Sequence, residues 1–315
     1  MTAIPVLSGG AYAAELVQSH LRRIVELQTP VLEDTDPEPL HQLRVRFRRM
    51  RATLAQFAPA LELPEVVTGQ RLAKFGRSLG LARDLDVLRG RLEGDLLPLL
   101  PPRELANLKR VQKQLKRERR LAFEALVDTL KGKRYLQLIA ALQGWLKQPR
   151  TTALGEEPVR AWLPEWKADA LAGLMLHPGW RCRGYGAAGD HEALHDLRKR
   201  IKAARYALTN LEELEGDALS PWIERFKAMQ EQLGDFNDLL VLQRALEDQV
   251  EGDLDRQLPT LCSLLLEQRA QTWGRWQTSS TAMRDPQTQE QFRLMQLGLG
   301  ANQPSSAAAT ANPPG

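Results

Sequence analysis

Apolar residues recur at spacings of three and four along almost the whole chain. Leu, Ala, Gln, Glu, Arg and Lys dominate, Val, Ile and Thr are sparse, and no clean alternation of apolar and polar residues appears. This pattern predicts an all-α protein. Helices are expected near residues 11–28, 39–58, 65–91, 103–130, 132–148, 159–176, 190–213, 219–249, 255–281 and 285–299. Prolines, among them Pro30, Pro37 and Pro59, are expected to separate them.

The two sets of helices look like an internal repeat. The segment HQLRVRFRRMRATLAQF (41–57) aligns with HDLRKRIKAARYALTNL (195–211) at an offset of 154 residues. The same gapless offset places RDLDVL (83–88) on NDLLVL (237–242). We expect two four-helix-bundle-like repeats related by a pseudo-two-fold axis and joined near 150–158. The predicted division is residues 1–154, 155–300 and a disordered low-complexity tail at 301–315.

Composition is that of an ordinary globular protein, with 43% hydrophobic and 26% charged residues among 315. The two cysteines, Cys182 and Cys262, lie far apart and indicate neither a disulfide framework nor a cysteine metal site. No charged leader precedes an apolar run at the N-terminus, and the most apolar uncharged stretch, 135–146, is too short to span a bilayer. A cytoplasmic protein without a membrane partner is therefore expected.

Charge is distributed unevenly along the chain. There are 43 Lys and Arg against 39 Asp and Glu, a net charge of +4, but residues 1–154 carry +10 and residues 155–315 carry −6. Much of the positive charge lies in helical rows. At about 100° per residue, each row covers an arc of roughly 80° beside the predicted core stripe. The two matching rows are His41, Arg44, Arg48 and Arg51, and His195, Arg198, Lys202 and Arg205.

A third row of cations occurs only in the first half. It consists of Lys109, Lys113, Lys116 and Arg120. Cations at this spacing repel one another unless an anion or an acidic side chain lies across them. One interpretation is a solvated basic surface; the duplication beside the core stripe favours a groove for an extended polyanion. Because Tyr206 is the only aromatic residue close to these arcs, a backbone-only ligand such as polyphosphate is favoured over nucleic acid.

The pattern His-x-Leu-Arg-x-x-x-Arg-x-x-Arg at 41–51, followed by LGLARDLDVL (79–88), resembles the CHAD family (conserved histidine α-helical domain). HDLRKRIKAAR (195–205) and LGDFNDLLVL (233–242) resemble its second half. The resemblance implies two four-helix bundles and inorganic polyphosphate bound along basic surfaces, with possible association with polyphosphate granules. It implies that the phosphate contacts are made by the cations of the two matching rows, Arg44, Arg48, Arg51, Arg198, Lys202 and Arg205, with His41 and His195 as the name-giving histidines. Ala203 opposite Arg49 and Asn237 opposite Arg83 leave the second half with less charge, so the ligand is expected to lie mainly against the first half.

One competing motif is His191-Glu192-Ala193-Leu194-His195, a literal H-E-x-x-H that on a helix can bind zinc in hydrolases. His191 aligns with Pro37 and so is not part of the repeat, and Arg198 and Lys202 would disfavour a cation. The preferred prediction is therefore a non-catalytic binding protein with no metal or other cofactor. A nucleic-acid-binding module and a zinc hydrolase are the alternatives.

Overall fold

The computed structural model describes residues 7–184, 190–250 and 253–299. Helices dominate these residues, and the only extended pairings are two isolated bridges, Ser8 with Pro158 and Leu61 with Thr151. The all-α prediction is confirmed. In the first half the elements are α1 (Gly9–Glu33), α2 (Glu38–Gln56), η1 (Ala58–Ala60), α3 (Gly69–Gly90), a π turn η2 (Arg91–Leu96), η3 (Leu97–Leu99), α4 (Pro102–Lys131) and α5 (Lys133–Lys147).

The second half has more short elements. They are α6 (Ala153–Glu156), η4 (Val159–Trp162), α7 (Leu163–Leu171), η5 (Leu174–Leu176), η6 (Pro178–Arg181), α8 (Asp190–Thr209), α9 (Glu212–Glu215), η7 (Gly216–Ala218), α10 (Ser220–Gln249), α11 (Leu254–Gln257), α12 (Pro259–Arg284) and α13 (Pro286–Gln296). Shifted by 154 residues, α2, α3, α4 and α5 overlap α8, α10, α12 and α13 in order. The pseudo-two-fold relation and the division at residue 154 stay predictions.

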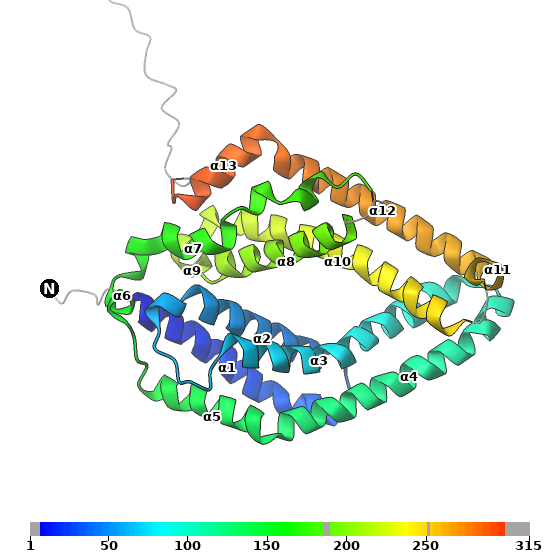
Figure 1. Cartoon of the computed structure of the whole chain (residues 1–315), viewed down its shortest axis with the longest axis horizontal. Helices are drawn as coiled ribbons and strands as arrows, with labels where there is room; N and C mark the ends of the chain where they lie inside the picture. The colour runs from blue at the N-terminus through cyan, green and yellow to red at the C-terminus, as the bar shows by residue number, and fades with distance from the viewer. Residues whose placement is uncertain (1–6, 185–189, 251–252, 300–315) are drawn as a thin grey trace, which may run out of the picture.

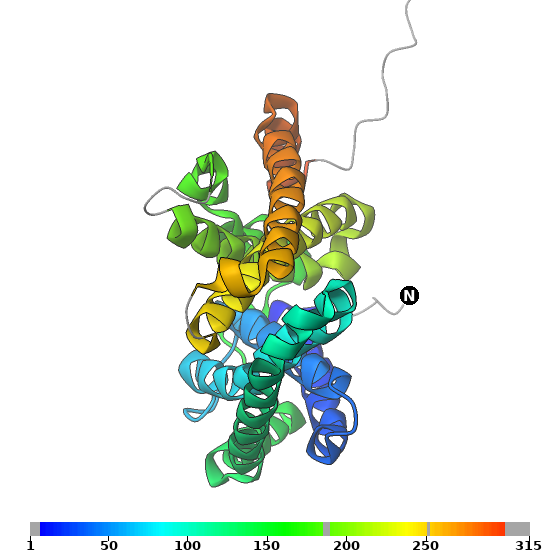
Figure 2. The ribbon, with the colours of Figure 1, turned by 90° about the vertical axis from the view of Figure 1, so that its right-hand side faces the viewer.

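The helices form two layers that face each other (Figure 1). One layer holds α1, α2, α3 and α5, and the other holds α7, α8 and α10, with α12 and α13 on its outer side. Seen from the end, α5 lies at one edge of the molecule and α13 at the opposite edge, and α4 and α12 run from these two edges toward the middle (Figure 2). None of the helices in the described residues is long and apolar enough to cross a membrane.

Each basic row borders a stripe of apolar residues, as the heptad-like spacing predicts. The two stripes are fully or almost fully buried: Leu43, Phe47, Met50, Leu54 and Phe57 on and after α2, and Leu197, Ile201, Ala204, Leu208 and Leu211 on and after α8. Burying these residues fixes the rotation of both helices, because turning either one would expose its stripe to water. The basic arcs are thereby held in one orientation.

Two of the contact zones between the layers hold buried polar residues. In the first, Asn210 after α8 donates from Nδ2 to Gln56 Oε1 at 2.8 Å, and its carbonyl accepts from the Tyr12 hydroxyl at 2.6 Å. In the second, the carboxylate of Glu104 on α4 accepts from the backbone N–H groups of Thr260 and Leu261 at 2.9 and 3.0 Å, at the first turn of α12. The bonded residues are buried or half-buried, so the two layers are held at both ends.

Several predicted helix boundaries are wrong, among them the helix over 255–281, which is divided into α11 and α12. Pro30 lies inside α1, which continues to Glu33 and ends at Asp34 with φ of 51°. Only the last turn follows the proline, so little of the helix loses hydrogen bonds, and Val31 is buried there. The helix predicted over 159–176 is broken into η4, α7 and η5, because Gly173 adopts a left-handed φ of 66°. The predicted linker 150–158 contains the short helix α6, and the predicted tail lies outside the described residues.

Candidate functional site

The two matching basic rows meet where α2 packs against α8, between the two contact zones. Five of the predicted residues act on one another electrostatically there: Arg44, Arg48, Arg198, Lys202 and Arg205, which we call the basic cluster. All five are partly buried. The structure therefore joins, in one place, cations that lie about 150 residues apart in the sequence.

Lys202 lies at the electrostatic centre of the basic cluster. Burial, followed by the charges of Arg48, Arg198, Arg44 and Arg205, lowers the pKa of Lys202 to about 7. The pKa of Arg48 is also lowered, first by burial, although the Tyr206 hydroxyl acts in the opposite direction. Bringing positive charges this close costs free energy in the unliganded protein. An anion placed among them would remove that cost.

Several polar atoms around the basic cluster have no hydrogen-bond partner. The Nε atoms of Arg48, Arg198 and Arg205 are buried without one among the described residues, and so is the hydroxyl of Tyr206. The guanidinium of Arg205 lies over the ring of Tyr206, with Cζ 5.0 Å from the ring centroid. Buried donors are normally satisfied, so these unpaired donors of one charge sign have hydrogen-bonding capacity that an acceptor could use.

The two halves of the basic cluster differ in their contacts with acidic residues. Arg44 donates from Nη1 to Asp84 Oδ1 at 2.5 Å and to the carbonyl of Gly80 at 2.9 Å. At the same offset of 154 residues, Asp238 has no ion pair with Arg198 among the described residues. Burial raises the pKa of Asp238. The charge of Arg198 acts against this shift by lowering the pKa of Asp238, but the two groups form no ion pair, so Arg44 is the more strongly neutralised of the two arginines.

Glycines allow the close approach of both arginines. A Cβ at Gly80 would lie 3.4 Å from Arg44 Nη1, and one at Gly234 would lie 3.2 Å from Arg198 Nη2. These two glycines align in the repeat. Each guanidinium therefore lies flat against a helix surface that carries no side chain at that point, α3 in one half and α10 in the other.

The remaining members of the matching rows lie at the margin of the basic cluster. Arg51 and His195 are exposed, and His41 is half-buried. Burial, and then the nearby Arg83, lower the pKa of His41, while burial and then Lys199 lower that of His195. Both imidazoles are therefore mainly neutral at pH 7 and available as hydrogen-bond donors or acceptors. The charges that lower the pKa values of Arg48 and Lys202 come from the other cluster residues.

The third row of cations, which we call the α4 row, is separate from the basic cluster. Lys109, Lys113, Lys116 and Arg120 are all exposed on α4. Lys116 lies 3.9 Å from Glu93, and Arg120 lies 3.9 Å from Glu124. The charges that lower the pKa values of Arg48 and Lys202 belong to the other cluster residues, and no hydrogen bond or ion pair joins this row to the cluster among the described residues.

Some residues that shape the site were missed by sequence reasoning. Arg91, from η2, donates to the backbone carbonyl and the carboxylate of Asp235 at 3.0 and 3.1 Å, beside Gly234. Arg119, next to the α4 row, forms ion pairs with Asp34 and Asp86 that raise its pKa. No periodicity marks these two arginines, because each pairs with residues distant in sequence.

The H-E-x-x-H motif lies in the first turns of α8, with His191 half-exposed and His195 exposed. In the part of the chain that the structure describes, no group of three or more His, Cys, Asp or Glu residues is placed to hold a metal ion. The chemistry available at this face is that of the neighbouring cations.

Comparison with known proteins agrees with this architecture. A family model for the CHAD domain matches residues 15–247. The crystal structure of the CHAD domain from the plant Ricinus communis is 25% identical, with a TM-score of 0.57 over 96% of this chain and 95% of that one. PptA from Streptomyces chartreusis is 17% identical, with a TM-score of 0.59 over 91% of this chain and 99% of that one, and shows the same fold. No curated protein sequence matches the chain. Because the family model covers most of its length, the chain belongs to the CHAD family.

Proposed function

We propose that this protein binds inorganic polyphosphate at the basic cluster. The observation that carries the proposal is the concentration of five half-buried cations from both halves, three of them with a buried, unpartnered Nε. Arginine offers forked donors to phosphate oxygens, and lysine offers a mobile point charge. Family membership is consistent with this ligand.

The ligand is proposed to be a phosphate chain in preference to a nucleic acid. Single-strand binding commonly uses aromatic rings on which bases stack. Tyr206, the aromatic residue that contacts the basic cluster, is 5% exposed and already covered by Arg205. A chain made only of phosphates needs no such ring.

Binding is proposed to occur without turnover. The cluster residues are guanidinium and ammonium groups, which stabilise phosphate oxygens. Incubation of long-chain polyphosphate with the protein, followed by gel analysis, should leave the chain length unchanged. Shortening of the chain would show that the protein is an enzyme. We further propose a cytoplasmic location, with association to polyphosphate granules through this binding.

A salt-dependent titration tests the proposal. Long-chain polyphosphate should bind with an affinity that falls steeply as salt rises, by analogy with counterion release from nucleic acids. The variant Arg48→Ala/Arg198→Ala/Arg205→Ala should bind at least about tenfold more weakly, with a shallower salt dependence. The control variant Arg134→Ala/Lys147→Ala/Arg150→Ala removes the same charge from exposed positions away from the basic cluster.

The outcomes separate the candidates. Equal losses in the two variants would mean that only net charge matters and would overturn the assignment of the site. Displacement of bound polyphosphate by RNA or duplex DNA at matched charge concentration would overturn the assignment of the ligand.

A further inference from the structure

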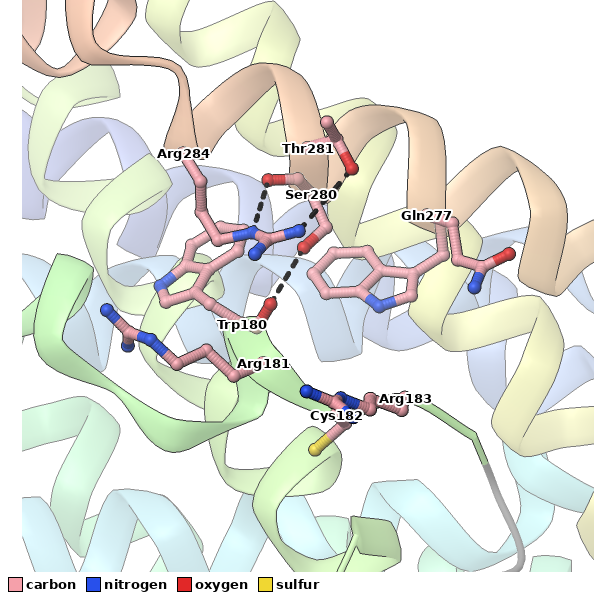
Figure 3. Close-up of a pocket in the computed structure, with 9 residues that line it drawn as sticks. Trp180, Arg181, Cys182, Arg183, Gln277, Ser280, Thr281 and Arg284 are labelled. Carbon is pink, nitrogen blue, oxygen red and sulfur yellow. Dashed lines mark hydrogen bonds between the residues drawn. The ribbon is translucent and has the colours of Figure 1, made fainter.

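A pocket of about 420 Å³ lies on the second half, between the segment around η6 and the helix α12. Figure 3 shows its lining, with Arg181 and Arg183 on the η6 segment and Arg284 reaching in from α12. None of its lining residues belongs to the basic cluster. Its volume is within the range of small-molecule sites.

The floor of the pocket is built from two stacked tryptophans. The rings of Trp180 and Trp276 have centroids 5.6 Å apart and an interplanar angle of 18°, and both residues are 2% exposed or less. Trp180 donates from Nε1 to the carbonyl of Leu174 at 2.7 Å, and its own carbonyl accepts from Ser280 Oγ at 3.1 Å. These bonds hold η6 against α12, so the pocket is preformed.

The walls carry positive charge without a balancing carboxylate among the lining residues. Arg181 and Arg183 have no ion-pair or hydrogen-bond partner among the residues the structure describes. Arg284 donates from Nε to the carbonyl of Ser280 and from Nη2 to Thr281 Oγ1, at 3.3 and 3.4 Å, which orients its head and leaves Nη1 available. Gln277 and Thr281 add uncharged polar groups.

The remaining lining residue does not counter this charge. Burial, and then the nearby Asp190, raise the pKa of Cys182 to about 11, so the thiol is protonated at neutral pH. Three guanidinium groups with hydroxyl and amide groups between them match the oxygens of closely spaced phosphates. Because both rings lie in the buried floor, the pocket offers no exposed aromatic face for a nucleobase.

We infer that this pocket is a second anion site, separate from the basic cluster, which takes a short linear oligophosphate or the end of a longer phosphate chain. A ligand with two or three adjacent phosphates can contact arginines from both walls at once. A single sulfate or phosphate could not, and should bind more weakly.

Sodium tripolyphosphate is the probe, and the protein lacking the basic cluster (Arg48→Ala/Arg198→Ala/Arg205→Ala) is the background. Calorimetry should show one remaining class of sites with a stoichiometry near one. Adding Arg181→Ala/Arg183→Ala/Arg284→Ala should weaken this binding at least about tenfold. Adding Arg134→Ala/Lys147→Ala/Arg150→Ala, which removes the same charge, should change it far less. Equal changes would overturn the inference.

A second readout keeps all arginines in place. In the full chain labelled with 5-fluorotryptophan, tripolyphosphate should shift the ¹⁹F signals of Trp180 and Trp276 and leave that of Trp145, in the first half, unchanged. If neither pocket signal moves, the pocket is not a site. If long-chain polyphosphate also shifts these signals, the ligand of the pocket is the end of a long chain. If only tripolyphosphate shifts them, the ligand is a free oligophosphate.

This result is independent of the proposed function. If long-chain polyphosphate binding is lost in the cluster variant but the pocket variant behaves as its control, polyphosphate binding at the basic cluster stands and the pocket site fails. If the cluster variant binds long chains normally and the pocket variant loses tripolyphosphate binding, the proposed function fails and the pocket site stands.

Discussion

Arg44 Nη1 lies 2.5 Å from Asp84 Oδ1, in an ion pair that the second half of the molecule does not reproduce. The matching residues there, Arg198 and Asp238, form no such pair among the described residues, and burial raises the pKa of Asp238. The first half carries the larger net positive charge, but within the basic cluster Arg198, from the second half, is less compensated than Arg44. Net charge along the chain and charge available at the site therefore differ.

Removing the acid that pairs with Arg44 should strengthen polyphosphate binding. The carboxylate of Asp84 is well exposed, so its interaction with Arg44 is screened and worth less than about 1 kcal/mol. Asp84→Asn keeps an acceptor of the same shape, and we expect about a two- to fivefold lower Kd at low salt. The matched control is Asp95→Asn, an exposed acid on η2. Weaker binding of the Asp84 variant would mean that the ion pair positions Arg44 productively.

The two halves should contribute unequally to affinity. From charge counts alone, replacement of Arg44, Arg48 and Arg51 is expected to cost more than replacement of the matching residues in the second half. The geometry supports the opposite order, because Arg51 is exposed and apart from the basic cluster and Arg44 is paired. We expect Arg198→Ala/Lys202→Ala/Arg205→Ala to weaken binding more, with a salt slope shallower by about two to three. Parallel titrations of the two triple variants over a range of salt decide between the two orders.

The glycine beneath Arg198 should be intolerant of a side chain. Gly234→Ala would place Cβ 3.2 Å from Arg198 Nη2, so the guanidinium must move. We expect this variant to bind polyphosphate at least about threefold more weakly than the wild-type protein. Gly80→Ala, with 3.4 Å to Arg44 Nη1, should have a smaller effect. Gly76→Ala is the control, because nothing lies within 4 Å of its Cβ; it should stabilise α3 by about 0.5–1 kcal/mol and leave binding unchanged. Binding by Gly234→Ala equal to that of Gly76→Ala would contradict this role.

The fold was largely predictable because it depends on local periodicity. Three- and four-residue spacing identified the helices and the buried stripes beside Arg44 and Arg198, and the repeat placed both basic rows. The end of the first helix was predicted wrongly because a proline in the last turn, here Pro30, removes few hydrogen bonds. The continuous helix over 159–176 was predicted wrongly because the left-handed Gly173 interrupts it. Other features depend on how the layers pack against each other, and no local sequence pattern predicts that packing. They are the distance between the two basic rows, the pairing of Arg44 and the contact between Arg91 and Asp235.

Glu104 should be important for the contact between the layers. It is 3% exposed and accepts hydrogen bonds from the first turn of α12, where backbone N–H groups otherwise lack partners. Glu104→Gln replaces one acceptor with a donor, and we expect a loss of about 1–3 kcal/mol in the free energy of unfolding. Chemical denaturation measures it, with the exposed Glu124→Gln on the same helix as the control.

The same carboxylate should contribute to acid sensitivity. Burial raises the pKa of Glu104, but the hydrogen bonds from Thr260 and Leu261 outweigh burial and the net shift is downward. A lowered folded-state pKa gives stability that is present above the unfolded-state value and is lost as pH falls through the folded-state value. The wild-type protein should therefore lose stability in that acidic window more steeply than Glu104→Gln. If the free energy of unfolding has the same pH dependence in both proteins, Glu104 is not the group responsible for the acid sensitivity.

Lys202 should make the free protein less stable than it would be without this charge. Its pKa is about 7 in the folded chain and near 10.5 when unfolded, so between these values the unfolded chain binds more protons and stability rises with pH. The cost of the ammonium group is therefore fully present below pH 7. Lys202→Met should raise the free energy of unfolding at pH 6.5 by at least about 1 kcal/mol and have little effect near pH 10. Thermal unfolding at the two pH values measures the difference.

Polyphosphate binding should take up a proton at Lys202. A bound polyanion raises the pKa of Lys202 above 7, because it offsets the repulsion from Arg48 and Arg198. The affinity should consequently be constant below pH 7 and fall about tenfold between pH 7 and 8.5. His41 and His195, whose pKa values are lowered, are neutral throughout this window and do not contribute. Lys202→Arg, which stays charged, should bind with an affinity independent of pH over the same interval. Calorimetry in buffers of different ionisation enthalpy should detect proton uptake in the wild-type protein alone, and equal uptake in the arginine variant would show that another group titrates.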